Sequence, residues 1–108
     1  THLSDAPWLI VVFQRNQDVL ADGREVKTYY AAESVGIAVG LLIAALHRAG
    51  LATLTHTPAP MGFLRELCGR PASERPYVIL PVGYPASDCT VPDLARKRLD
   101  EIAEFVEG

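Results

Sequence analysis

Hydrophobic positions along the chain gather in runs that are separated by polar turns. The run from Pro7 to Gln14 combines β-branched and aromatic residues and then becomes polar, which predicts a strand buried on both faces. A surface turn follows around Asp22-Gly23, and from about Tyr29 the spacing becomes helical. Between Val35 and Leu46 apolar residues occupy every side of this helix, so we expect it to be buried nearly all round.

Glycines set the expected limits of the next elements. Gly50 followed by Leu51 is typical of a left-handed helix C-terminus, so the long helix is expected to end near Ala49. Residues 51–54 then predict a short strand, and residues 62–69 predict a short helix closed by a glycine.

The remaining residues predict one more strand and one more helix. Residues 75–85 are typical of a buried strand, in which Pro81 indicates an edge position or a bulge. An extended arm containing Pro92 follows, and an amphipathic helix is expected from roughly Lys97 to Val106. With 108 residues and no internal repeat, the chain has the length of about one domain.

Composition limits the classes of function. A net charge of −3 and a pI near 5.5 argue against a nucleic-acid partner, which would call for a basic patch. No membrane partner is expected either, because the longest uncharged apolar run is shorter than the ~20 residues that span a bilayer. Cys68 and Cys89 stand apart without metal-ligand spacing, so we expect no metal site, no disulfide, a small buried thiol at Cys68, and reduced thiols in a cytoplasmic protein.

The long helix carries a signal for self-association. Gly36 and Gly40 lie one turn apart and would let another backbone approach closely, although each costs about 1 kcal/mol of helix propensity relative to Ala. The chain is also rich in apolar residues, 49% without counting glycine. Both features predict a homodimer with this helix at its centre.

One polar loop interrupts the apolar pattern and is the main candidate site. Thr55, His56 and Thr57 follow a short strand directly, and Pro58 and Pro60 stiffen the backbone behind them. Side chains held in this way lose little entropy when they bind a polar ligand edge. The alternative is that the threonines cap the short helix that follows or satisfy the backbone of a turn.

Several motifs together resemble the nitroreductase superfamily of FMN-dependent oxidoreductases, in its iodotyrosine deiodinase-like branch. They are "APWLIVVF", "THTP", "GRPASERPYVILPVGYP" and "VPDLARKRLDEI", and the resemblance covers nearly all of the chain. It implies an α+β fold, a nitroreductase-like mixed sheet flanked by helices, of which residues 1–108 would form the C-terminal half. The arginine-rich segment and the lid carrying Glu, Tyr and Lys that this branch uses have no counterpart in these residues.

The resemblance also implies a cofactor site. Thr55, His56 and Thr57 would contact the flavin ring of FMN, with Thr57 placed at N5 as the catalytic hydroxyl. His56 stands where the branch usually has Thr, so its contact would come from the backbone. Arg96, in the arm before the last helix, would bind the FMN phosphate, a role that suits a guanidinium. The alternative for Arg96 is a solvated basic turn.

The implied activity is an NAD(P)H-dependent reduction of FMN followed by reductive dehalogenation of a halotyrosine or halophenol. Two alternatives stay open from the residues alone. One is a general nitroaromatic or quinone reductase, and the other is a non-catalytic half-domain without its cofactor. The resemblance implies a small aromatic substrate and a homodimer with FMN at its interface.

Overall fold

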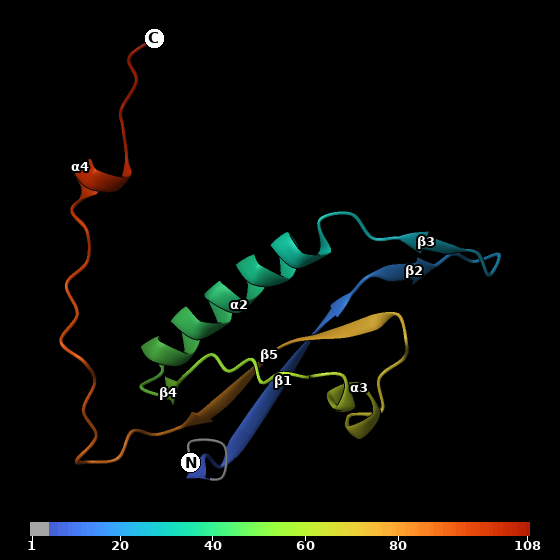
Figure 1. The fold of residues 1–108 in the computed structure, drawn as a ribbon, viewed down its shortest axis with the longest axis horizontal. Coiled ribbons are helices and arrows are strands. Elements are labelled where there is room, and N and C mark those ends of the chain that lie inside the picture. The colour runs from blue at the N-terminus through green and yellow to red at the C-terminus, as the bar shows by residue number, and fades with distance from the viewer. Residues whose placement is uncertain (1–4) are drawn as a thin grey trace.

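A computed structural model describes residues 5–108, and its centre is a three-stranded antiparallel sheet with strand order β1-β5-β4 (Figure 1). These strands are β1 (Trp8–Arg15), β5 (Glu74–Gly83) and β4 (Ala52–Thr53). A separate hairpin joins β2 (Gln17–Val19) to β3 (Glu25–Lys27), and Gly23 takes a φ of 88° in its turn. The surface turn expected around Asp22-Gly23 is confirmed, whereas the two short strands beside it were not predicted from the sequence.

Three helices complete the described chain: α2 (Ala31–Arg48), α3 (Phe63–Leu67) and α4 (Leu99–Ile102). In Figure 1, α2 lies across β1 and β5, α3 lies beside β5, and α4 stands apart in the C-terminal arm. The α+β class expected from the sequence is confirmed.

The hydrophobic core lies between α2 and one face of the sheet. Its most buried side chains are Val39 of α2 and Val78, Leu80 and Val82 of β5. The spacing of two between the β5 residues places them on the same face, so the strand presents a continuous apolar row to the helix. β5 is thus the buried strand expected from residues 75–85.

Local glycine signals predicted the ends of both longer helices. α2 ends at Arg48 with Ala49 as its C-cap, and Gly50 follows at a φ of 82°. The N–H of Leu51 donates to the carbonyl of Leu46, which closes the last turn. Gly69 likewise follows α3 at a φ of 65°.

The expectation that α2 is buried nearly all round is wrong for this chain. Val39 is its only buried residue, whereas Ile37 and Leu41 are 68% and 69% exposed. The described residues supply one packed layer against the helix, so its opposite apolar side lies open.

By length and composition alone, α2 is apolar enough to cross a membrane. One side of it, however, packs through Val39 on a sheet that has open strand edges. Such edges leave backbone groups that hydrocarbon cannot satisfy, so α2 is better explained as the core helix of this fold.

The two helix glycines have different surroundings, and neither meets another backbone within the described residues. A Cβ at Gly36 would lie 3.1 Å from the Tyr77 hydroxyl oxygen, so Gly36 makes room for a side chain of β5. A Cβ at Gly40 would meet nothing within 4 Å. Within this chain Gly40 therefore faces open space, and the approach of a second copy's backbone stays a prediction.

Pro81 occupies neither an edge strand nor a bulge, which corrects the sequence-based expectation. β5 is the central strand, and the register shift lies between Val12 and Phe13, away from Pro81. Thr53 pairs with Val82, and His56 pairs with Ile79. In the same register, Leu54 lies opposite Pro81. Pro81 has no N–H to donate there, and the ladder is interrupted at that point.

Two further expectations fail because burial depends on what covers an element. β1 was expected to be buried on both faces, yet Trp8 is 73% and Leu9 is 48% exposed. The last helix was expected from Lys97 to Val106, yet α4 covers only Leu99–Ile102, and its residues are exposed. A short helix needs an apolar surface to pack on, and α4 has none within residues 5–108.

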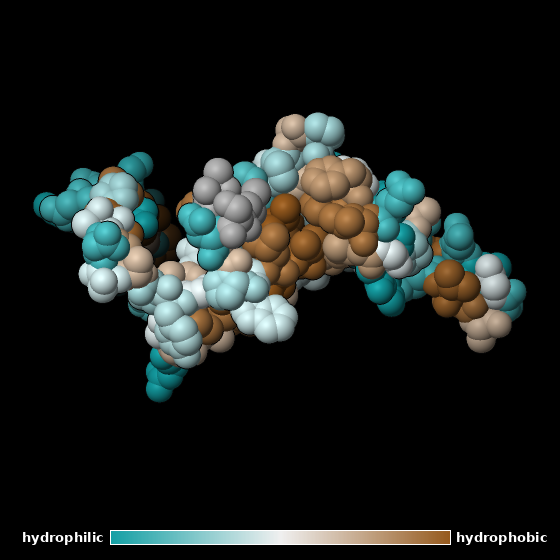
Figure 2. Space-filling model, turned by 90° about the horizontal axis from the view of Figure 1, so that it is seen from below, coloured by the Kyte–Doolittle hydropathy of each residue, from teal (hydrophilic) through white to brown (hydrophobic). Residues whose placement is uncertain are grey.

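The described part of the chain is open rather than compact. Its radius of gyration is 18.1 Å, against about 13 Å for a compact domain of this length. The accessible surface is 8927 Å², which exceeds by about 3,000 Å² the value for a compact monomer of 11.7 kDa. Figure 2 shows hydrophobic side chains gathered on the surface of one face. We conclude that much apolar surface of this chain lacks its covering layer.

Candidate functional site

The polar loop is fixed at its centre by backbone pairing with β5. The N–H of His56 donates to the carbonyl of Ile79, and the N–H of Ile79 donates to the carbonyl of His56, each at 2.9 Å. In an extended segment the neighbours of a paired residue direct their side chains to the opposite face. Thr55 and Thr57 are both exposed, whereas His56 is half-buried.

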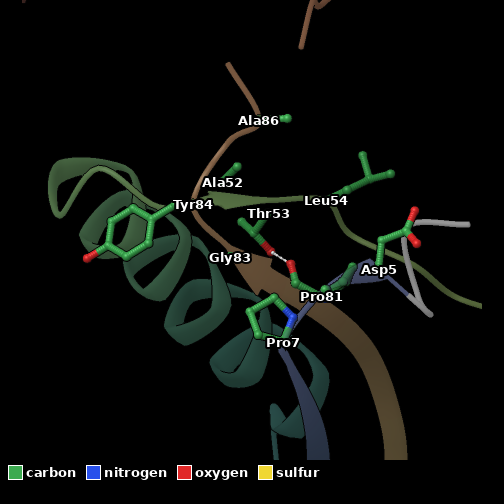
Figure 3. Close-up of a pocket in the computed structure, with 10 residues that line it drawn as sticks. Asp5, Pro7, Ala52, Thr53, Leu54, Pro81, Gly83, Tyr84 and Ala86 are labelled. Atoms are coloured by element: carbon green, nitrogen blue, oxygen red, sulfur yellow. Dashed lines mark hydrogen bonds between the residues drawn. The ribbon is translucent and has the colours of Figure 1, made fainter. Parts of the chain in front are cut away.

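A side-chain hydrogen bond fixes the start of the loop. The Thr53 hydroxyl donates to the Pro81 carbonyl at 2.7 Å, beside the interruption of the ladder (Figure 3). In the same view Leu54 and Tyr84 extend outward around a hollow of about 380 Å³. The loop therefore leaves the sheet from a well-held strand end.

The structure tests the alternative that the threonines cap the short helix. α3 begins after Gly62, and no side chain makes a cap hydrogen bond at its N-terminus. Within residues 5–108, neither the Thr55 nor the Thr57 hydroxyl has a hydrogen-bond partner. The helix-capping interpretation is wrong, and both hydroxyls are available to a ligand.

Thr57 lines a second hollow, of about 390 Å³, between the loop, α3 and the start of β5. Two arginines line it as well, Arg65 from α3 and Arg75 from β5. The remaining lining residues are apolar or glycine: Pro58, Ala59, Pro60, Met61, Gly62 and Pro76. The loop peptide between Ala59 and Pro60 is cis.

Arg96 is not brought to this loop within the chain. It is exposed in the arm after β5, which leaves the sheet and extends away from α2 and α3 (Figure 1). Arg98 forms an ion pair with Asp100, so it adds less positive potential beside Arg96 than the sequence predicted.

Sequence reasoning missed an ionic cluster behind the loop. Glu74, the first residue of β5, is buried and accepts two hydrogen bonds of 2.5 Å from Arg70. The Nε of Arg65 donates to the Glu74 carbonyl at 2.8 Å, so α3 is tied to the start of β5. The signal for it was the "GRPASER" segment, in which Arg70 precedes Glu74 by four residues.

Hydrogen bonding to Arg70 lowers the pKa of the Glu74 carboxyl, and burial opposes this effect. The same pair raises the pKa of Arg70. Both side chains are therefore charged near neutral pH, and the cluster serves as a fixed anchor for α3.

The cysteines and possible metal ligands give no further site. Cys68 and Cys89 are both free and exposed, so the expectation of a buried Cys68 is wrong. Among the residues that the structure describes, no group of His, Cys, Asp and Glu is arranged to hold a metal ion.

Comparison with known sequences identifies the family. The sequence model of the nitroreductase family matches residues 1–84, most of the chain. The chain belongs to the nitroreductase family. Its resemblance to this family, first drawn from "THTP" and "GRPASERPYVILPVGYP", is thereby confirmed.

Similarity to individual proteins places the chain more narrowly. It is 59% identical over 95 residues to the iodotyrosine deiodinase of Haliscomenobacter hydrossis, covering 88% of this chain and 43% of that protein. It is 52% identical over 102 residues to iodotyrosine deiodinase 1 of Mus musculus, covering 94% of this chain and 36% of that protein.

A solved nitroreductase-family structure has the same arrangement of elements. It is oxidized iodotyrosine deiodinase bound to FMN and 3-iodo-L-tyrosine, with a TM-score of 0.72 and 33% identity. The match covers 91% of this chain and 47% of that one. This chain thus spans less than half the length of these relatives.

Proposed function

We propose that the protein is an FMN-dependent reductive dehalogenase that acts on halogenated tyrosines or related phenols. The observation that carries this proposal is the pair of exposed hydroxyls, Thr55 and Thr57, which have no hydrogen-bond partner among residues 5–108 and lie on a loop whose backbone is fixed at His56. The similarity to iodotyrosine deiodinases supports the choice of substrate class.

The loop fits the edge of a flavin ring. Thr55 and Thr57 would hold the ring edge by hydrogen bonds, and Thr57 would meet N5 as the catalytic hydroxyl. The N–H of His56 is committed to Ile79, so His56 acts in this proposal as the backbone anchor between them. When bound, FMN supplies the redox chemistry, and these residues supply its orientation.

We propose further that the protein is a homodimer in which Arg96 reaches the FMN phosphate of a site built with the second copy. The support is the surface of about 3,000 Å² that this chain exposes beyond that of a compact monomer, together with the exposed side of α2. The arm that carries Arg96 extends away from its own loop, which suits a contact with another copy.

NAD(P)H as the electron donor and a cytoplasmic location complete the proposal. For the FMN phosphate, the negative charge suits the guanidinium of Arg96, which forms no ion pair with any residue that the structure describes. The free, exposed thiols of Cys68 and Cys89 suit a reducing compartment.

The test uses the full-length protein, purified and examined for a flavin absorption spectrum. With NADPH or dithionite as reductant, we expect release of iodide from 3-iodotyrosine. Absence of bound flavin would support the alternative of a non-catalytic half-domain. Reduction of nitroaromatic compounds without iodide release would instead support the general reductase.

A further inference from the structure

Two arginines that the proposed flavin contacts do not use line the same hollow as Thr57. Arg65 comes from α3 and Arg75 from the second position of β5, and the hollow between them measures about 390 Å³. No carboxylate is among its lining residues. Both arginines therefore border one concave surface whose other lining residues, apart from Thr57, are apolar or glycine.

Arg65 is held in position by one nitrogen and leaves the others unused. Its Nε donates to the Glu74 carbonyl at 2.8 Å, and the side chain is half-buried. Its two terminal nitrogens make no hydrogen bond within residues 5–108. A guanidinium oriented in this way presents two preset donors to an oxyanion.

Arg75 has no ion pair or hydrogen bond to its side chain in the described part of the chain. The carboxylate of the preceding residue pairs with Arg70 instead, and successive side chains of a strand point to opposite faces, which places the Glu74 and Arg75 side chains apart. By contrast, four arginines elsewhere each pair with a carboxylate: Arg15, Arg24, Arg70 and Arg98.

We propose that Arg65 and Arg75 form an anion-binding subsite that takes a phosphate or carboxylate group of a small molecule bound beside Thr57. Paired guanidinium groups suit such oxyanions because they donate several hydrogen bonds in one plane. The proposed function places the flavin at Thr57, and the identity of the bound molecule as a substrate or electron donor rests on that function. The existence of the anion subsite does not depend on the proposed function.

The test titrates full-length protein with inorganic pyrophosphate and, separately, with acetate, at constant ionic strength in a calorimeter. We expect one of these anions to bind, and Arg75→Gln to weaken that binding by about tenfold or more. Arg75→Lys should keep part of the affinity because it keeps the charge. Arg24→Gln is the matched control, because Arg24 lies on the distant hairpin and should leave anion binding unchanged.

Preference for pyrophosphate assigns the subsite to the phosphate of a nucleotide, and preference for acetate assigns it to the carboxylate of an amino acid. If neither anion binds, or if Arg75→Gln binds as tightly as the wild type, the subsite does not exist. Flavin absorption and iodide release are measured in parallel. If flavin absorption and iodide release are absent while the anion still binds, only the proposed function is overturned.

Discussion

Arg70 donates two hydrogen bonds of 2.5 Å to the two carboxylate oxygens of the buried Glu74, whose backbone carbonyl accepts a third bond from Arg65. These three hydrogen bonds join α3 and the residues just after it to the first residue of β5, next to the loop that carries Thr57. Two of them link charged groups, so their contribution to stability depends on pH.

Glu74→Gln is expected to destabilise the full-length protein at pH 7, because the variant loses the charged acceptor of Arg70. The folded-state pKa of Glu74 is lowered, so its contribution is complete above the ordinary Glu value of about 4.3 and is lost as pH falls through the folded-state pKa. Unfolding temperatures of wild type and variant should therefore begin to approach each other below about pH 4.3 and converge once the pH is below the folded-state pKa. Asp22→Asn, at an exposed ion pair with Arg24, should change little at any pH. A constant gap between Glu74→Gln and wild type down to acid pH would contradict the ionic assignment.

Gly36→Ala is expected to conflict with Tyr77. The new methyl group would lie 3.1 Å from the Tyr77 hydroxyl oxygen and offset the gain in helix propensity of about 1 kcal/mol. In a Tyr77→Phe background this contact is removed, so the same substitution should stabilise. Urea unfolding of the four proteins of this cycle measures the coupling, and additive effects would show that the two residues do not interact.

Gly40→Leu tests the proposed dimer. A Cβ at Gly40 meets nothing within 4 Å in the single chain, so the larger side chain should be harmless to a monomer. In a dimer packed through α2 it should overpack the interface by about 1–3 kcal/mol. Sedimentation at micromolar concentration should show a shift toward monomer, and an unchanged dimer would mean that α2 lies outside the interface.

Thr57→Ala is expected to keep FMN bound while dehalogenation falls and nitroaromatic reduction persists. Loss of one neutral hydrogen bond, worth about 1 kcal/mol, is small against the ring and phosphate contacts but acts at the proposed reacting edge. Thr57→Ser keeps the hydroxyl and should keep the ratio of the two activities. The ratio of iodide release to nitroreduction is the measurement, and equal ratios in both variants would remove Thr57 from catalysis.

Arg96→Ala in the full-length protein should weaken FMN binding by about tenfold or more, because it removes a charge-assisted hydrogen bond to phosphate. Arg98→Ala is the neighbouring control, since Arg98 is already paired with Asp100. Fluorescence titration with FMN measures the affinity of each variant. Equal affinities for the wild type and Arg96→Ala would return Arg96 to the interpretation of a solvated basic turn.

The elements predicted well are those whose signals are local. Gly50 and Gly69 need a left-handed backbone, so they marked the ends of α2 and α3 correctly. The stiff loop around Thr55 and Thr57 was likewise visible in the sequence, and the structure leaves both hydroxyls unpartnered within residues 5–108.

Features that depend on distant neighbours could not be predicted from the sequence. A central strand can contain Pro81 because the pairing with the neighbouring segment is interrupted at Leu54. No local sequence pattern indicates this interruption. The Arg70 and Glu74 spacing equals that of an ordinary surface helix pair, and only the fold shows that Glu74 is buried. The exposure of Ile37 and Leu41 depends on which chain covers α2.

The arm from residue 84 to residue 108 contains no buried side chain, and outside α4 and a turn at residues 86–89 it has no helix or strand. An extended, uncovered segment is a ready substrate for proteases, whereas the same segment becomes resistant once it is packed against a second chain. In the proposed dimer, cleavage of this arm would therefore report the assembly state of the protein. A copy without its partner would be the one that proteases cut first.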